Sequence, residues 1–177
     1  IFAYDIDGKR LSALIPRLKR SGATNVQLVH PSEPVQLDTL TGLMDCVFVD
    51  APCTGTGTWR RRPDSKWRIK QGQLEKRMSE QTEILDAAAA FVKPGGRMVY
   101  ATCSFLMEED EDRVAEFLES HPEFTEEDAA AAAIASGLLT DEGANIVQRF
   151  RMPTGSVRLT PHRARTDGFF FAVLRRT

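Results

Sequence analysis

The stretch that decides the fold is CVFVDAPCTGTGT, residues 46–58. It opens with four apolar residues of the kind that form a buried strand, and Asp50 and Cys53 follow directly. A second stretch, MVYATCS at residues 98–104, has the same form and delivers Cys103. Ligands and chemistry lie at the carboxyl ends of the strands in an open parallel α/β sheet. We therefore expect an aspartate and two cysteines at that edge, with a thiol that works as a nucleophile.

The rest of the chain alternates between strand and helix patterns. Strands are expected at residues 1–5, 25–29, 45–50, 97–102, 145–151 and 168–174. Helices are expected at residues 7–20, 71–92, 107–120 and 128–139. Within the first helix, Pro16 should kink the helix or restart it. Strands that alternate with helices predict an α/β fold with parallel strands.

Composition sets the class of protein. The 177 residues, of which 42% are apolar, suffice for one domain with a real core. We expect a cytoplasmic location, because nothing resembles a membrane span or a signal peptide. An odd number of cysteines, three, suits a reducing compartment in which thiols stay free. The first residue, Ile1, lies in a strand-like run, so we expect the chain to continue something longer.

The net charge of −2 hides a strong asymmetry. Residues 108–128 hold eleven acids and one base, out of 25 acids and 23 bases in the chain. The remainder therefore has 22 bases and 14 acids, a net charge of +8. A basic surface of this kind is suited to binding phosphates.

The loop after residue 58 concentrates that positive charge. Two tryptophans, Trp59 and Trp67, stand among six bases within eleven residues: Arg60, Arg61, Arg62, Lys66, Arg68 and Lys70. Bases interleaved with aromatic side chains favour single-stranded nucleic acid, whose phosphates they neutralise and whose bases they stack on. The alternative is a solvated basic loop with its tryptophans packed into the core. The position of the loop, directly after Cys53, favours the nucleic-acid interpretation.

The three cysteines differ in their surroundings. Cys103 precedes an acidic helix, whose amino terminus lowers a thiol pKa while the acids raise it, so activation must come from the facing wall. Cys46 lies within an apolar run and is expected to be core packing. For Asp50 and Cys53, the alternative to a functional role is a tight turn with an incidental cysteine. No spacing of Cys and His matches a zinc site, so we expect no metal.

Several motifs together resemble one family. DAPCTGTG at residues 50–57, RRRPDSKWR at 60–68, YATCS at 100–104, and the closing LTPHR and DGFF at 159–163 and 167–170 are similar to the Sun (Fmu-type) RNA cytosine-5 methyltransferases. The resemblance runs from Ile1 to Arg176. It implies a Rossmann-like, S-adenosylmethionine-dependent methyltransferase fold with a mostly parallel sheet, in which residues 1–177 form a single, partial catalytic domain.

The resemblance also implies roles for individual residues. The cysteine of the family's Thr-Cys motif, here Cys103, attacks carbon 6 of cytosine, and the Pro-Cys cysteine, here Cys53, releases the RNA. Asp50 holds the base and lies beside the cofactor, and Asp5 matches the position that binds the cofactor ribose; capping of a helix is the alternative for Asp5. The partner would be ribosomal or transfer RNA with an unstacked cytidine. The RNA-binding residues would be Arg60, Arg61, Arg62, Lys66, Trp67 and Arg68.

Two departures from the family leave alternatives open. The Gly-rich cofactor loop and its strand should precede Asp5, and the sequence begins after that point, so we expect a sheet incomplete at its N-terminus. The family's acidic residue near the adenine is replaced by VHPS at residues 29–32. One alternative is therefore a truncated, non-catalytic RNA-binding remnant. A thiol redox protein, which would need Cys53 and Cys103 within bonding distance, is another. The sequence does not predict an oligomeric state.

Overall fold

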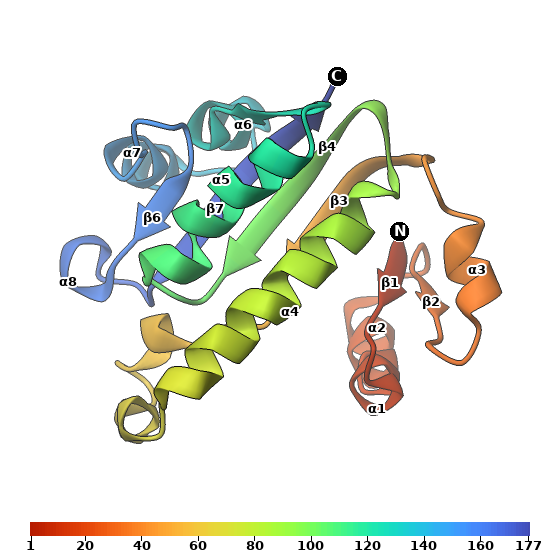
Figure 1. Cartoon of the computed structure of the whole chain (residues 1–177), viewed down its shortest axis with the longest axis horizontal. Coiled ribbons are helices and arrows are strands. Elements are labelled where there is room, and N and C mark those ends of the chain that lie inside the picture. The colour runs from red at the N-terminus through yellow and green to blue at the C-terminus, as the bar shows by residue number, and fades with distance from the viewer. The chain divides into compact units, whose positions relative to one another are not determined.

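The computed structural model describes residues 1–177, except for the side chains of Pro34 and Gln71. The chain divides into two compact units, Ile1–Thr41 and Gly42–Thr177 (Figure 1). Each unit has its own sheet, of two strands in the first and of five in the second.

The first unit is a small β-α-β arrangement. Its strands are parallel and place Ala3 opposite Leu28. Its elements are β1 (Phe2–Tyr4), α1 (Gly8–Ser12), α2 (Ile15–Ser21), β2 (Gln27–Val29) and α3 (Pro34–Asp38). The carboxylate of Asp7 caps α1 by accepting a hydrogen bond from the backbone N–H of Lys9 at 2.9 Å. The predicted first helix is thus two helices, because Pro16 lies in the first turn of α2, where its missing N–H costs nothing.

The second unit holds the two motif strands as neighbours. Its helical elements are η1 (Thr56–Thr58), η2 (Pro63–Trp67), α4 (Gln71–Ala89), η3 (Met107–Glu109), α5 (Glu111–Ser120), α6 (Ala129–Ala135), α7 (Asp141–Arg149) and α8 (Pro161–Ala164). Its strands are β3 (Met44–Asp50), β4 (Val92–Thr102), β5 (Phe124–Glu127), β6 (Val157–Leu159) and β7 (Phe169–Arg176). The order across the sheet is β3-β4-β7-β5, and β6 also pairs with β7. Strands β3 and β4 are parallel, whereas β7 runs antiparallel to its partners.

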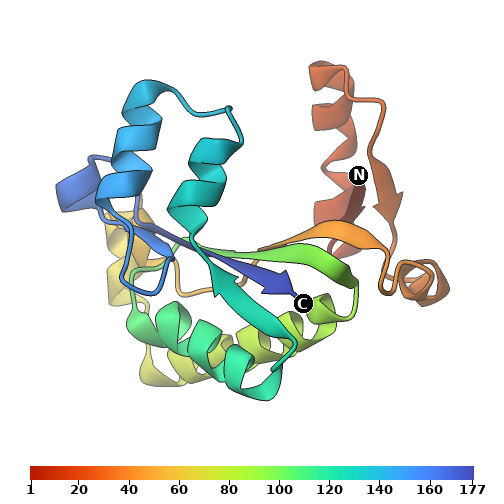
Figure 2. The ribbon, with the colours of Figure 1, turned by 90° about the horizontal axis from the view of Figure 1, so that it is seen from above.

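Helices cover both faces of this sheet (Figure 2). Side chains alternate between the faces of a strand. On β7, Phe170 and Leu174 accordingly pack with α4 and α5, and Val173 packs with α6 and α7. On β4, Tyr100 belongs to the first of these cores and Val99 borders the second. Burial on both faces is what fixes the register of these central strands.

Residues 145–151 were predicted as a strand, and that prediction is wrong. Residues 145–149 are the second half of α7, which begins at Asp141 and ends at Arg149, and Arg151 forms only an isolated bridge with Val157. Thr140 caps the helix by accepting a hydrogen bond from the N–H of Gly143 at 3.1 Å. The apolar residues Ile146, Val147 and Phe150 then fall on one helical face, which packs on the sheet. A short apolar run fits a strand or a buried helix equally well.

The prediction that Cys46 packs in the core is also wrong. Cys46 is exposed, and so is Phe48, at 66% of its surface. Val47 and Val49, which alternate with them, face the core beneath α4. Strand β3 is the edge strand of this sheet, so the apolar run is buried on one face only.

Candidate active site

The carboxyl ends of β3 and β4 bring the two motifs together. The strands are in register up to Asp50 and Ala101, and the N–H of Ala51 donates to the carbonyl of Ala101 at 3.0 Å. The loops that follow place the Sγ atoms of Cys53 and Cys103 3.3 Å apart, both half-buried. The pairing of two thiols at this edge is the central geometric feature of the second unit.

The two thiols have opposite electrostatics. A hydrogen bond with Cys53 lowers the pKa of the Cys103 thiol to about 7, against the opposing effects of burial and of the charge on Asp50. The same hydrogen bond, followed by burial, raises the pKa of Cys53. The contact between the two sulfur atoms therefore shifts the two pKa values in opposite directions, and Cys103 is the more readily ionised thiol. Glu109 and Asp50 both act to raise the pKa of Cys103, so the lowering of this pKa comes from Cys53 on the facing loop.

Gly57 lets the catalytic loops approach each other closely. Its N–H donates to the carbonyl of Cys103 at 2.9 Å, and its own carbonyl accepts from the N–H of Gly168 at 2.8 Å. A Cβ on Gly57 would lie 2.2 Å from the carbonyl oxygen of Gly168, which no side chain could tolerate. This glycine therefore serves contact between backbone segments of the chain itself.

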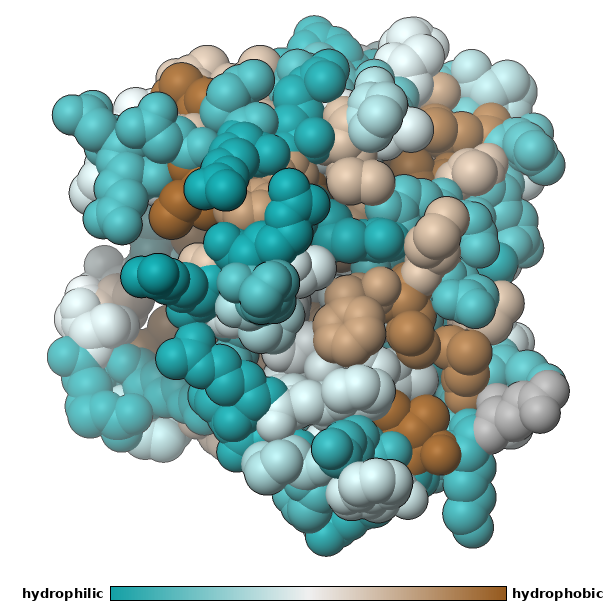
Figure 3. Space-filling view, turned by 90° about the vertical axis from the view of Figure 1, so that its left-hand side faces the viewer, coloured by the Kyte–Doolittle hydropathy of each residue, from teal (hydrophilic) through white to brown (hydrophobic). Residues whose placement is uncertain are grey.

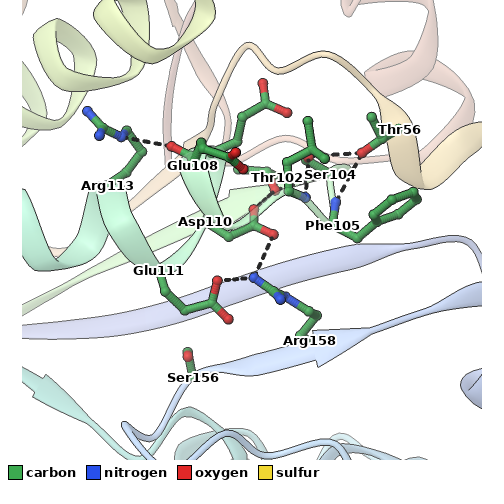
Figure 4. Close-up of polar contacts among 12 residues, drawn as sticks. Thr56, Thr102, Ser104, Phe105, Glu108, Asp110, Glu111, Arg113, Ser156 and Arg158 are labelled. Atoms are coloured by element: carbon green, nitrogen blue, oxygen red, sulfur yellow. Dashed lines mark hydrogen bonds and ion pairs between the residues drawn. The ribbon is translucent and has the colours of Figure 1, made fainter. Parts of the chain in front are cut away.

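Hydroxyl groups connect the same loops beneath the thiols. The Oγ atoms of Thr56 and Ser104 are 3.0 Å apart, and Thr56 also accepts from the N–H of Phe105 at 3.1 Å (Figure 4). Thr56 and Ser104 are fully buried. These bonds fix the turn that carries Cys103 against the loop that carries Cys53.

Glu109 is a site residue that the sequence prediction missed. Its side chain is completely buried and accepts hydrogen bonds from the N–H and Oγ1 of Thr54, at 2.7 and 2.5 Å, and from Nε2 of Gln81 at 3.3 Å. Gln81 also donates to the carbonyl of Pro52 at 2.8 Å. Glu109 thus clamps the turn on both sides of Cys53. The run of acids does not single out Glu109, because the adjacent Glu108 belongs to the same run and is exposed.

Asp110 lies behind the Cys103 turn. It is fully buried, and its Oδ1 accepts from Oγ1 of Thr102 at 2.6 Å, which in turn accepts from the N–H of Ser104 at 3.2 Å. Burial raises the pKa of Asp110 to about 7. Arg158 lies 3.6 Å from Oδ2 of Asp110 and forms an ion pair with Glu111 (Figure 4). The network holds the strand end that carries Cys103.

The two aspartates expected to bind cofactor lie in different units. Asp50 is exposed at the end of β3, next to the paired thiols. Asp5 follows β1 in the first unit, is half-buried, and accepts from the N–H of Asp7 at 2.7 Å. Capping of α1 is done by Asp7, so capping does not explain Asp5.

The basic loop separates its two tryptophans. Trp59 is half-buried against Phe105, with ring centres 5.4 Å apart. Trp67 is 80% exposed, with Nζ of Lys66 4.7 Å from its ring centre. The five bases of the same loop that were expected to bind RNA are all exposed: Arg60, Arg61, Arg62, Lys66 and Arg68. Of the two interpretations of the tryptophans, core packing holds for Trp59, and Trp67 is free to stack on a base.

The residues that the structure describes include neither a metal-binding cluster nor a helix suited to a membrane. Among their side chains, no group of three or more His, Cys, Asp or Glu is placed to hold a metal ion. Among their helices, none combines the length and the apolar character that crossing a membrane needs.

Curated relatives share nearly the whole chain. Residues 1–175 match the family described as "16S rRNA methyltransferase RsmB/F". Ribosomal RNA small subunit methyltransferase B of Sodalis glossinidius (strain morsitans) is 33% identical over 172 residues, covering 97% of this chain and 35% of that protein. The protein of the same name from Yersinia pseudotuberculosis is 35% identical over 174 residues, covering 97% and 35%. The chain thus spans about 35% of the length of these relatives.

Two solved structures superpose on nearly the whole chain. The crystal structure of PH0851 superposes with a TM-score of 0.80 at 33% identity, over 99% of this chain and 37% of that one. NSun6 from Pyrococcus horikoshii with SFG gives a TM-score of 0.71 at 27% identity, over 99% and 41%. The predicted Rossmann-like methyltransferase fold and the resemblance to the Sun family are confirmed. From residue 1 to residue 175, this chain belongs to the 16S rRNA methyltransferase RsmB/F family.

Proposed function

We propose that this chain carries the chemistry of an S-adenosylmethionine-dependent RNA cytosine-5 methyltransferase. The observation that carries the proposal is the 3.3 Å contact between Cys53 and Cys103 at the ends of β3 and β4. The family match supports methyl transfer to ribosomal RNA. Two thiols with opposite pKa shifts suit a reaction that needs a nucleophile first and a proton acceptor later.

In the proposed reaction, the Cys103 thiolate adds to carbon 6 of the cytosine. Carbon 5 is a poor nucleophile in the aromatic ring, and the new S–C6 bond turns the ring into an enamine whose carbon 5 accepts the methyl group. The hydrogen bond with Cys53 lowers the pKa of Cys103, so this thiol ionises more readily than an ordinary cysteine.

Release then requires loss of the proton on carbon 5, after which the S–C6 bond breaks and aromaticity returns. Cys53 is the residue proposed for this step, since its sulfur touches that of Cys103. When Cys103 gives up its negative charge to the substrate, the hydrogen bond and charge that raise the pKa of Cys53 are lost. Cys53 can then lose its proton to solvent and, as a thiolate, take the proton from carbon 5.

The methyl donor is proposed to be S-adenosylmethionine, which supplies a methyl group on a sulfonium. NSun6, a structural neighbour, was crystallised with SFG, an analogue of that cofactor. Each unit, taken by itself, has an aspartate at the end of a strand: Asp50 is exposed at the carboxyl end of β3, and Asp5 follows β1. Carboxylates accept hydrogen bonds from ribose hydroxyls and from the exocyclic amine of a base.

The RNA is proposed to approach along the basic loop. Trp67 offers a stacking face, and Arg60, Arg62 and Lys66 offer exposed positive charge beside it. The target cytidine must be unstacked for its carbon 6 to reach a half-buried thiol. Relatives named as small-subunit ribosomal RNA methyltransferases favour ribosomal over transfer RNA. A cytoplasmic location is part of this proposal.

Calorimetric titration of S-adenosylmethionine into the 177-residue chain tests the proposal. One-to-one binding, followed by transfer of a labelled methyl group to carbon 5 of cytidine in small-subunit ribosomal RNA, is the expected result. Asp50→Asn should weaken binding, and Asp45→Asn, a change at the other end of β3, should leave it unchanged. Binding of RNA without any binding of cofactor would favour the alternative, a non-catalytic RNA-binding remnant.

A further inference from the structure

A second basic site lies between α7 and the segment around α8. It is a cavity of about 730 Å³ whose floor includes Ile146, Phe150 and Ala164. Arg149, at the end of α7, and Arg163 and Arg165, in and after α8, line it. We call this cavity the arginine pocket. Figure 3 faces the side on which α7 and α8 lie and shows mainly hydrophilic side chains with smaller apolar patches between them.

The arginines converge without acidic partners. The guanidinium carbons of Arg149 and Arg163 lie 5.6 and 5.4 Å from the ring centre of Phe150, so the two charges are at most 11 Å apart. In the described part of the chain, neither they nor Arg165 forms an ion pair, whereas Arg151 nearby is paired with Asp128. An anion bound among these unpaired guanidinium groups would accept charge-assisted hydrogen bonds from them.

The acid in the lining is at the far end. Glu142 precedes Arg149 by seven residues on α7, which is about 10 Å along a helix. With three arginines and one glutamate in its lining, the pocket carries a net positive charge. Its apolar floor, formed in part by the ring of Phe150, lies beside two planar guanidinium groups. This combination suits a phosphate that carries a nucleoside.

The arginine pocket is tied to the catalytic loops. The carbonyl of Arg165 accepts a hydrogen bond from Nη1 of Arg60 at 2.8 Å, and Asp167 forms an ion pair with Arg61. Gly168 then touches Gly57, which is bonded to the carbonyl of Cys103. From Arg165 to Gly168 the chain spans at most about 11 Å.

The turn that makes this connection has an unusual backbone. Arg165 has a φ of +57°, and no other described residue except glycines has a positive φ. A left-handed conformation is unfavourable for an arginine and occurs where surrounding contacts demand it. Here it brings the Arg165 carbonyl to Arg60 while its side chain lines the pocket.

We propose that the arginine pocket binds backbone phosphates of the single-stranded RNA that flanks the target cytidine. The inference rests on the proposed RNA substrate and extends it to a second anchoring point. RNA leaving the basic loop near Arg60 reaches the pocket over a short path on the same unit. Contacts of this kind fix the register of the strand without reading its sequence.

The test is anisotropy of a fluorescent, unstructured 20-nucleotide oligouridylate, titrated with the full chain at several KCl concentrations. The variant is Arg149→Gln with Arg163→Gln. The control, Arg97→Gln with Arg175→Gln, removes the same formal charge from two arginines that are paired with Glu127 and lie about 20 Å along β4 from Cys103. The pocket variant should weaken binding roughly tenfold and reduce the salt slope by about 1.4, since each lost phosphate contact removes about 0.7. The affinity of the control variant should stay within about twofold of the wild-type affinity.

Further variants distinguish a failure of the pocket proposal from a failure of the proposed function. Arg149→Lys with Arg163→Lys should recover most of the affinity, and thermal unfolding checks that each variant folds. If Arg62→Gln with Lys66→Gln weakens binding while the pocket variant matches the wild type in affinity and slope, the pocket proposal is overturned and the function stands. If the wild type does not bind RNA, the proposed function itself fails. Loss of binding to a poly-glutamate peptide but not to RNA would assign the pocket to a protein partner and refute the proposal.

Discussion

Replacement of Glu109 tests whether this buried carboxylate holds the loop of Cys53. Glu109→Ala removes the acceptor of three hydrogen bonds, two from the half-buried Thr54 and one from the buried Gln81. Hydrogen bonds to a charged group contribute about 1.5–3 kcal/mol each, and part of that loss is recovered by relaxation and water. The free energy of unfolding should therefore fall by about 3–5 kcal/mol.

The assay is urea unfolding followed by tryptophan fluorescence, because Trp59 and Trp67 both lie in the second unit. The corresponding fall in Tm is about 10 °C for a chain of this size. Glu108→Ala is the matched control: Glu108 is exposed, so its replacement should change stability by less than about 0.5 kcal/mol.

A second readout reports the loop itself. Loss of the clamp should raise the rate at which iodoacetamide alkylates Cys53, measured by mass spectrometry below the unfolding transition. Glu109→Gln keeps one carbonyl acceptor and should fall between the wild type and Glu109→Ala. If Glu109→Ala loses less than about 1 kcal/mol and leaves the alkylation of Cys53 unchanged, Glu109 does not hold this loop.

Three further predictions follow from the thiols, the buried acid and the exposed ring. Cys53→Ala removes the hydrogen bond that lowers the pKa of Cys103. The midpoint of Cys103 alkylation should therefore move from near pH 7 toward alkaline values, and Cys53→Ser should move it less. An unchanged midpoint would refute the pairing. The pKa of Asp110 is raised to about 7, so the native state holds its proton more tightly than the unfolded state, and stability should fall as pH rises from about 4 to 7. Asp110→Asn should flatten that fall in urea titrations, and equal slopes would contradict the burial argument. Trp67→Ala should weaken binding of single-stranded RNA by roughly tenfold with little change in Tm, whereas Trp59→Ala should lower Tm; the reverse pattern would exchange their roles.

The parts of the site that were predicted from sequence depend on local patterns. Apolar runs that end in DAPC and TCS indicate strands whose ends carry reactive groups, and parallel pairing of those strands brings the ends together. The restart of a helix at Pro16 is local in the same sense, because the missing N–H acts within one turn. The exposed basic loop followed from its composition alone.

The parts that were missed depend on contacts between distant residues. Glu109 and Glu108 are indistinguishable in sequence, and only the packing of η3 beneath the loop of Thr54 buries one of them. The antiparallel direction of β7 is a matter of topology that no periodicity encodes. Cys46 is exposed because β3 is an edge strand, which its apolar sequence does not reveal. The Sγ atoms of Cys53 and Cys103 lie 3.3 Å apart, whereas the bonding distance that a thiol redox protein would need is about 2.0 Å.

The most direct test of the account is to identify the cysteine that becomes attached to RNA. Transcribed small-subunit ribosomal RNA and S-adenosylmethionine would be incubated with Cys53→Ala and with Cys103→Ala, and adducts read by denaturing gel and tandem mass spectrometry. The account predicts that Cys53→Ala accumulates RNA bound to Cys103, and that Cys103→Ala forms no adduct and transfers no methyl group. An adduct on Cys53 in Cys103→Ala would exchange the two roles, and methylation by Cys103→Ala would contradict the covalent mechanism.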